Sequence, residues 1–144
     1  MAVRIDAVDE PSDEVCVALA ALLPQLNPAI VPPDRQRLAK LIADPAVSLL
    51  VARDGDTIVG TATVIVYTSP AWTKARIEDV VVDQSARGQG VGRALVDACI
   101  EIARGKGCTI VELQSKRSRV EANRLYQEMG FELRDSNFYR LTLR

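Results

Sequence analysis

Three glycines in five positions mark the segment RGQGVG, where Gly88, Gly90 and Gly92 separate an apolar run from a helical pattern. Glycines in this place lose much conformational entropy on folding, so some feature must require them. A helix N-terminus has unpaired backbone N–H groups and a partial positive charge, which suit it to bind phosphate. Arg87 and Arg93 add positive charge to the segment. The segment is therefore either a phosphate-binding loop or an ordinary glycine-rich turn.

Two common phosphate-binding motifs do not fit this segment. The dinucleotide fingerprint GxGxxG needs its third glycine where this chain has Arg93, and Gly92 comes one place too early. The nucleotide P-loop needs Lys and then Ser or Thr after its last glycine, whereas Arg93 and Ala94 follow here. The pattern that remains is R-x-x-G-x-G, formed by Arg87, Gly90 and Gly92.

A second segment, ANRLYQEMGFE at 122–132, places Asn123 and Tyr126 on a predicted helix and follows them with Gly130 and Phe131. A tyrosine phenol can donate a proton to a leaving group. The alternative is an amphipathic tyrosine that belongs to the core.

Two adjacent carboxylates, Glu78 and Asp79, begin the stretch IEDVVV. Neighbouring residues of a regular strand point to opposite faces, so one of the two should point into a cleft. The chain contains no histidine, so proton transfer falls to Glu, Asp, Tyr, Cys, Lys or water. Each carboxylate is either a general base or a solvated or structurally paired charge.

Hydrophobic periodicity predicts the elements that position these residues. Strands are predicted at 3–8, 46–55, 57–68, 74–82, 108–115, 131–135 and 138–143, and helices at 13–24, 34–44, 91–104 and 120–129. The pair around the turn at Asp54 and Gly55 forms a hairpin. The strands on either side of the third helix should be parallel, because a strand–helix–strand crossover normally makes them so. The order is mixed α/β in a single domain, 1–144.

Composition excludes several classes of function. The chain has 144 residues, of which 48% are hydrophobic and 26% charged, so it can bury a core. A net charge of -1 and 4% aromatic residues speak against nucleic acid and anionic membranes as partners. We expect a cytoplasmic protein, because neither a signal peptide nor a membrane-length apolar run is apparent. The three cysteines are far apart and predict reduced thiols without a metal.

In the R-x-x-G-x-G pattern and the segment ANRLYQEMGFE together, the chain resembles the GNAT superfamily of acyl-CoA-dependent N-acetyltransferases. The resemblance is good from about Ile77 to the C-terminus, and the first half agrees only in its order of elements. It implies the GNAT fold, a central twisted mixed sheet of about six to seven strands flanked by about four helices. It also implies acetyl-CoA as cosubstrate, an amine as acceptor and no metal.

The resemblance implies how coenzyme A is held. Main-chain groups of the strand VVV pair with the pantetheine arm as an added strand would, and the backbone from Gly88 to Arg93 holds the pyrophosphate. The residues implied to bind the cofactor are Val80, Val81, Val82, Arg87, Gly88, Gln89, Gly90, Val91, Gly92, Arg93 and Asn123.

The resemblance also implies the catalytic roles. Tyr126 is the general acid that protonates the departing thiolate, and Glu78 is the general base for the incoming amine, with Asp79 as the alternative. The acceptor should lie against the first two helices and the loop 70–74, where the sequence has no signature for its identity. Whether the donor carries an acetyl group or a longer acyl group is left open by the sequence. Pairing of FYRLTL across a homodimer is expected from the family. A non-catalytic acyl-CoA-binding regulatory domain of the same fold is the alternative function.

Overall fold

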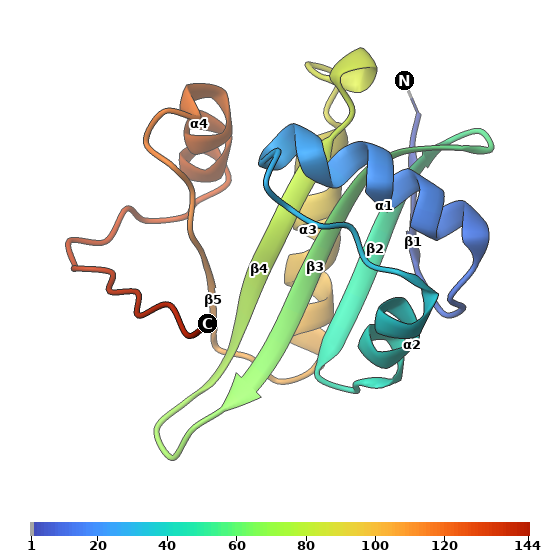
Figure 1. Cartoon of the computed structure of the whole chain (residues 1–144). Coiled ribbons are helices and arrows are strands. Elements are labelled where there is room, and N and C mark those ends of the chain that lie inside the picture. Colours follow the sequence, from blue (N-terminus) through green and yellow to red (C-terminus); the bar gives the residue numbers. More distant parts are fainter. Residues whose placement is uncertain (1) are drawn as a thin grey trace. The chain divides into compact units, whose positions relative to one another are not determined.

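The computed structural model describes residues 2–144, which form two compact units, one up to Gln114 and one from Ser115. Five strands and three helices make up the first unit (Figure 1). In chain order they are β1 Arg4–Ala7, α1 Asp13–Leu26, α2 Arg35–Ala43, β2 Val47–Asp54, β3 Thr57–Thr68, β4 Thr73–Val82, α3 Val91–Gly105 and β5 Ile110–Leu113.

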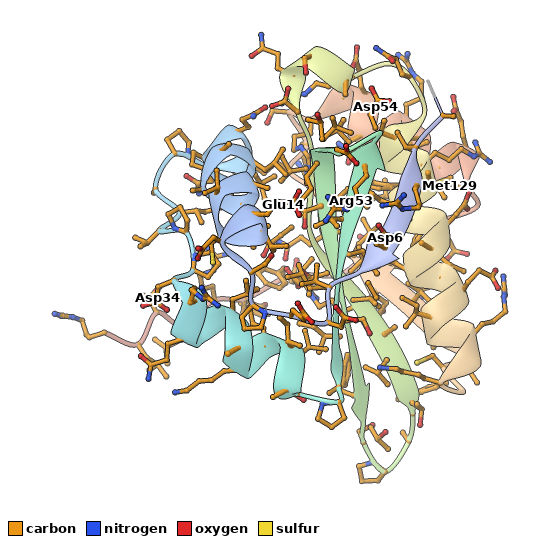
Figure 2. All side chains as sticks on the ribbon, turned by 90° about the vertical axis from the view of Figure 1, so that its right-hand side faces the viewer. Asp6, Glu14, Asp34, Arg53, Asp54 and Met129 are labelled. Carbon is orange, nitrogen blue, oxygen red and sulfur yellow. The ribbon has the colours of Figure 1, made fainter. Side chains whose placement is uncertain are left out.

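The sheet of the first unit has the strand order β1-β2-β3-β4-β5. Its strands are antiparallel except for β4 and β5, which run parallel on either side of the α3 crossover, so the predicted crossover is confirmed. Helices α1 and α2 pack on one face of the sheet and α3 on the other (Figures 1 and 2). The unit is therefore a helix–sheet–helix sandwich.

Side chains cap the N-termini of both helices on the first face. The Ser12 hydroxyl accepts a hydrogen bond from the Val15 N–H, and the Asp34 carboxylate accepts one from the Arg37 N–H. The end of α1 differs from the prediction, because the helix includes Pro24 and continues to Leu26. A proline in the last turn removes one N–H donor, yet the Asn27 N–H still bonds to the Leu23 carbonyl oxygen and closes the helix.

Apolar side chains fill both interfaces of the sandwich. Leu19, Leu22 and Leu38 are buried between the first two helices and the sheet. On the other face Gly60 of β3 lets α3 approach closely, because a methyl group there would lie 3.0 Å from Leu95 Cδ1 and 3.1 Å from the Val81 carbonyl oxygen. The lack of a side chain at Gly60 therefore allows the start of α3 to pack directly on β3 and β4.

Strand β4 contains a β-bulge near its centre. Its register with β3 pairs Thr63 with Glu78 and Thr61 with Val81, so two β4 residues oppose one β3 residue. Asp79, the first of those two residues, has φ 54° and is the only non-glycine residue of the described chain with a positive φ. The bulge bends the strand at the two predicted carboxylates.

The second unit contains one helix, α4 Val120–Glu128. Residues 131–144 form neither helix nor strand, so the two strands predicted at 131–135 and 138–143 are absent and the sheet has five strands where six to seven were expected. Alternation of apolar residues predicts a strand-forming sequence, but a strand also needs a partner for its backbone groups, which alternation does not specify. In the part of the chain that the structure describes, no helix has both the length and the apolar character needed to cross a membrane.

Candidate active site

The glycine segment leads into the N-terminus of α3. Gly88 and Gly90 have φ values of 77° and 83°, and added methyl groups there would meet nothing within 4 Å. The two glycines are therefore needed for backbone conformation, with open space above them. No side chain caps α3, which leaves its first N–H groups without a side-chain partner beside the exposed residues 87–90. This uncapped end of a 15-residue helix fits a phosphate.

Hydrogen bonds from α1 hold the residues just before this loop. Gln25 Nε2 donates to Asp83 Oδ1 (2.9 Å), and Gln25 Oε1 accepts from the Gln84 N–H (3.1 Å). Arg87 Nε donates to the Val82 carbonyl oxygen (3.1 Å). Bonds from Ser85 and Gln25 hold the pKa of Asp83 below its usual range. Arg87 thus fixes the loop, whereas the exposed Arg93 forms no ion pair within residues 2–144.

Strand β4 separates from β5 just before the predicted pantetheine-binding valines. The β4–β5 ladder runs from Lys74 opposite Ile110 to Ile77 opposite Leu113 and ends there. Over Glu78–Val82, β4 pairs only with β3 within the described chain. An extended ligand can add to the free side of such a strand through backbone hydrogen bonds. Val80, Val81 and Val82 occupy this free stretch.

The carboxylates of Glu78 and Asp79 both line one cavity in the first unit. The regular alternation expected from the sequence would send them to opposite faces, and that expectation is wrong because the bulge interrupts the alternation. Partial burial, and then the neighbouring Glu78 charge, raise the pKa of Asp79 above its ordinary value of 3.8, although the residue as a whole remains exposed.

Glu78 has a cationic partner on its own strand. Arg76 Nε donates to Glu78 Oε1, and Arg76 Nη2 donates to Gln114 Oε1 (3.1 Å). One oxygen of Glu78 is therefore engaged by a guanidinium. Asp79 forms no ion pair among residues 2–144, and its two neighbours in the strand are Glu78 and the uncharged Val80.

Tyr126 and Asn123 lie on α4 in the second unit. Tyr126 is buried, and its ring meets Phe131 edge-on with centroids 5.9 Å apart. The Asn123 side-chain nitrogen donates to the Lys116 carbonyl oxygen (2.9 Å) and to that of Arg117 (3.4 Å). Asn123 thus closes the loop before α4 and keeps its amide oxygen as an acceptor.

Three residues of this region were missed at the level of sequence. Gln25 and Gly60 shape the loop and the helix from distant parts of the chain, and Arg37 lines the same cavity as Glu78 and Asp79. None carries a local sequence signal, because each acts through tertiary contacts. Cys99 is no nucleophile in this setting, since burial raises the pKa of its thiol to about 12. Within residues 2–144 no group of three His, Cys, Asp or Glu side chains is placed to hold a metal.

Comparison with known proteins places this geometry in a family. The model of the acetyltransferase (GNAT) family matches residues 17–131. The chain belongs to the GNAT family. The match extends from α1 to Phe131 and includes the glycine loop, the bulged strand and α4.

Individual GNAT relatives are similar over different lengths. Glucosamine 6-phosphate N-acetyltransferase of Trypanosoma brucei brucei is 40% identical over 77 residues, which are 51% of this chain and 50% of that protein, so the chain spans about half of that relative's length. The solved aminoglycoside acetyltransferase from an uncultured soil sample, in complex with trehalose, is 25% identical, covers 99% of this chain and 97% of its own, and has a TM-score of 0.83.

A third protein, AAC(6')-Iy, was solved with the bisubstrate analogue CoA-S-monomethyl-acetylneamine. It is 20% identical, covers 99% of this chain and 100% of its own, with a TM-score of 0.79, and this likeness shows the fold alone. The chain, with its five-stranded mixed sheet and four α-helices, thus has the GNAT fold, with fewer strands than the sequence predicted.

Proposed function

We propose that the protein is an N-acetyltransferase that moves an acetyl group from acetyl-CoA to a primary amine by direct attack. The observation that carries the proposal is one continuous segment of the first unit. In it β4 leaves β5, bulges at two carboxylates that line a cavity, and runs through a left-handed glycine loop into an uncapped helix.

The cosubstrate fits this segment residue by residue. The free side of β4 at Val80, Val81 and Val82 suits the amide groups of a pantetheine arm. The N–H groups from Gly88 to Arg93 suit a pyrophosphate, with Gln89, Gly90, Val91 and Gly92 between them and Arg87 holding the loop. Asn123 is proposed as a further coenzyme A contact on the family resemblance, and its side-chain amide oxygen is the atom that could accept a hydrogen bond.

The chemistry conserves atoms and charge. The amine nitrogen attacks the thioester carbon, an N–C bond forms, and the C–S bond breaks. A β4 carboxylate accepts the proton that the amine loses, and the Tyr126 phenol gives a proton to the departing thiolate. Backbone N–H groups near the bulge stabilise the oxyanion of the tetrahedral adduct. The products are an N-acetylated amine and coenzyme A.

Two carboxylates compete for the role of base. Glu78 was the first choice from the sequence, but one of its oxygens accepts a bond from Arg76. Asp79 lines the same cavity and has a raised pKa, which brings a carboxylate closer to the working range of a base. We therefore propose Asp79 as the base and Glu78 as its charged neighbour, with exchange of the two roles as the alternative.

The two units together form a single GNAT domain, 1–144, in this proposal. The family match supports it, because residues 17–131 run across the boundary at Gln114. A homodimer is also proposed. Its support is the row of exposed apolar side chains in the C-terminal segment, Leu133, Phe138, Tyr139, Leu141 and Leu143. Sedimentation at several concentrations tests it, and a monomer at all of them would contradict it.

The decisive experiment for the activity measures free thiol released from acetyl-CoA with a panel of amines, with the acetylated product confirmed by mass spectrometry. The names of the relatives suggest glucosamine 6-phosphate and aminoglycosides as members of the panel. Amine-dependent release of one thiol per acetylated product supports the proposal. Tight binding of acetyl-CoA without transfer to any amine would favour the regulatory acyl-CoA-binding domain instead.

A further inference from the structure

A cavity of about 240 Å³ opens between the first two helices and strands β2, β3 and β4. It lies wholly within the first unit and is open to solvent. Its walls are mainly apolar, with Leu23, Leu49 and Ile65 among them. The volume is below the range of about 300–1,000 Å³ typical of pockets for drug-sized ligands, so it suits a small molecule or the end of a longer one.

Opposite charges stand at the two sides of this cavity. Glu78 and Asp79 line it from β4, and Arg37 lines it from the first turn of α2, which packs on β2. Strands β2 and β4 are two steps apart in the sheet, which corresponds to about 10 Å. The cavity therefore has an acidic side and a basic side with apolar surface between them.

The basic side lacks a partner within the described chain. The backbone N–H of Arg37 caps onto Asp34, but the Arg37 guanidinium forms no ion pair or hydrogen bond among residues 2–144. Arg35, two residues earlier on the same helix, does pair, with Asp13 at 3.0 Å. A guanidinium beside an apolar wall favours a planar anion that it can hold through two hydrogen bonds.

We propose that this cavity binds the acceptor and selects a small amine with an anionic group at its far end. The ammonium end lies at Asp79 and Glu78, an apolar spacer crosses β3, and a carboxylate or phosphate-type anion pairs with Arg37. The proposal rests on the acetyl transfer proposed above, because the amine held at Asp79 is the group that attacks the thioester.

Three amines of equal chain length separate the effect of the charge at the far end from that of the apolar spacer. 6-Aminohexanoate has the anion, hexylamine lacks it, and 1,6-diaminohexane replaces it with a cation. We expect kcat/KM for 6-aminohexanoate to exceed that for hexylamine by about tenfold, as for one charge-assisted hydrogen-bonded pair, and the diamine to be the poorest. The matched pair 6-aminohexanoate and 5-aminopentylphosphonate, which have the same spacer of five methylenes, shows whether the site prefers a carboxylate or a phosphate-type anion.

Reversal of the charge tests the residue. Arg37→Glu should invert the order of preference, so that 1,6-diaminohexane becomes a better acceptor than 6-aminohexanoate. Lys40→Glu is the matched control, because it makes the same change of charge on the same helix at an exposed residue outside the cavity lining. It should leave the order unchanged.

Equilibrium binding of the three amines, measured by calorimetry with and without acetyl-CoA, keeps the two proposals distinguishable. Arg37-dependent binding of 6-aminohexanoate without any thiol release supports the cavity assignment and overturns the activity. Acetylation of all three amines with equal kcat/KM, or unchanged preference in Arg37→Glu, overturns the cavity assignment and leaves the activity standing. Absence of both binding and turnover with every amine overturns both.

Discussion

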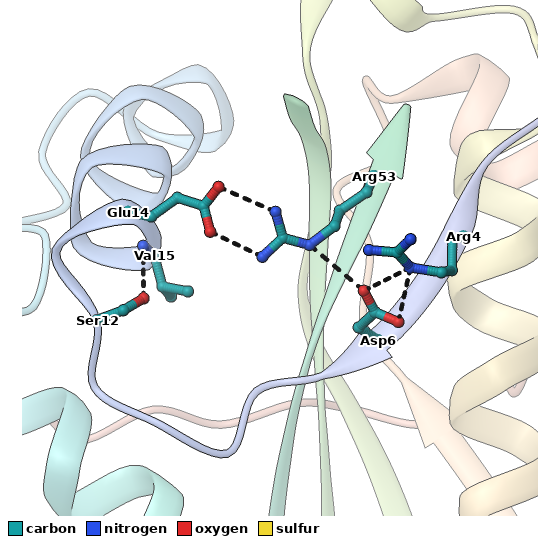
Figure 3. Close-up of polar contacts among 6 residues, drawn as sticks. All are labelled: Arg4, Asp6, Ser12, Glu14, Val15 and Arg53. Carbon is teal, nitrogen blue, oxygen red and sulfur yellow. Dashed lines mark hydrogen bonds and ion pairs between the residues drawn. The ribbon is translucent and has the colours of Figure 1, made fainter. Parts of the chain in front are cut away.

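Two charged clusters of the first unit have similar composition but opposite organisation. In the first, Arg53 of β2 forms two hydrogen bonds with Glu14 of α1 (3.0 and 2.8 Å) and an ion pair with Asp6 of β1 (3.3 Å), which Arg4 also holds (Figure 3). Every charge of this Asp6–Arg53–Glu14 cluster is paired. In the cavity cluster of Arg37, Glu78 and Asp79, the cation and the Asp79 carboxylate form no ion pair among residues 2–144.

The pKa shifts follow this difference in organisation. The hydrogen bond from Arg53 holds the pKa of Glu14 below its ordinary 4.5, whereas partial burial and the Glu78 charge raise the pKa of Asp79. A charged group that is paired stabilises the fold when it is ionised. An unpaired carboxylate near apolar surface binds a proton or a cationic ligand more readily. The first cluster is therefore structural, and the second has the properties expected of the proposed site.

The largest expected effect is a loss of activity on substitution in the cavity cluster but not in the Asp6–Arg53–Glu14 cluster. Asp79→Asn keeps side-chain size, and Asn tolerates the positive φ at this position, so the backbone should be retained. We expect kcat/KM at neutral pH to fall by roughly 10²- to 10⁴-fold, the usual contribution of a general base. Glu14→Gln is the control and should keep full activity in the same thiol-release assay. Equal losses in both variants would abolish the distinction between the clusters.

A smaller loss should follow from removal of the proton donor. Tyr126→Phe keeps the ring and its edge-on contact with Phe131 but removes the hydroxyl. We expect kcat to fall roughly ten- to a thousand-fold with acetyl-CoA affinity nearly unchanged, because the role proposed for the phenol is protonation of the leaving thiolate and not binding. Wild-type turnover under conditions where chemistry limits the rate would make Tyr126 a core residue only.

The two ends of α3 offer a matched test of the anion site. Gly92→Ala adds a methyl group in the first turn, where φ is not positive, and should weaken binding of coenzyme A about tenfold while helix propensity improves by up to about 1 kcal/mol. Gly105→Ala makes the same change in the last turn, where a methyl group meets nothing within 4 Å. Calorimetry should show unchanged affinity for Gly105→Ala. Unchanged affinity for coenzyme A in both variants would contradict binding of the pyrophosphate at the N-terminus of α3.

The smallest expected effects are on stability, and they have opposite signs. Because the folded-state pKa of Glu14 is lowered, its contribution is present above the ordinary value of 4.5 and disappears as pH falls through the folded-state value. Glu14→Gln should therefore lower the urea midpoint modestly at pH 7 and not in strong acid. Asp79 has a raised pKa, so its ionisation opposes folding as pH rises, and Asp79→Asn should raise the midpoint slightly at pH 7. Midpoints that move in the same direction would contradict the comparison.

Local rules predicted the parts of the fold that depend on neighbours in sequence. Ser12 and Asp34 begin their helices as capping residues do, the hairpin turns at Gly55, and the crossover makes β4 and β5 parallel. The glycine segment was found for the same reason, since Gly88 and Gly90 have the left-handed backbone that favours glycine.

The rest of the site depends on tertiary structure that has no local pattern. A bulge inserts one residue relative to a partner strand, so IEDVVV alone could not predict that Glu78 and Asp79 share a cavity. Arg37 of α2 lines the same cavity as Glu78 and Asp79 of β4, and no spacing in the sequence records that they meet there. The two C-terminal strands were predicted wrongly for the same reason. Residues 138–143 alternate as a strand does, but alternation does not specify which strand they would pair with.

The pH dependence of kcat/KM tests the central claim, that a carboxylate of β4 takes the proton from the amine. Activity of the wild type should fall as pH drops through a value above 3.8, because the base must be ionised and its pKa is raised. Asp79→Asn should lose this limb and recover activity only as pH rises and free amine accumulates, while Glu78→Gln keeps the wild-type shape. A profile of Asp79→Asn that coincides with the wild type would contradict the assignment, and wild-type profiles in both variants would mean that the amine enters already neutral.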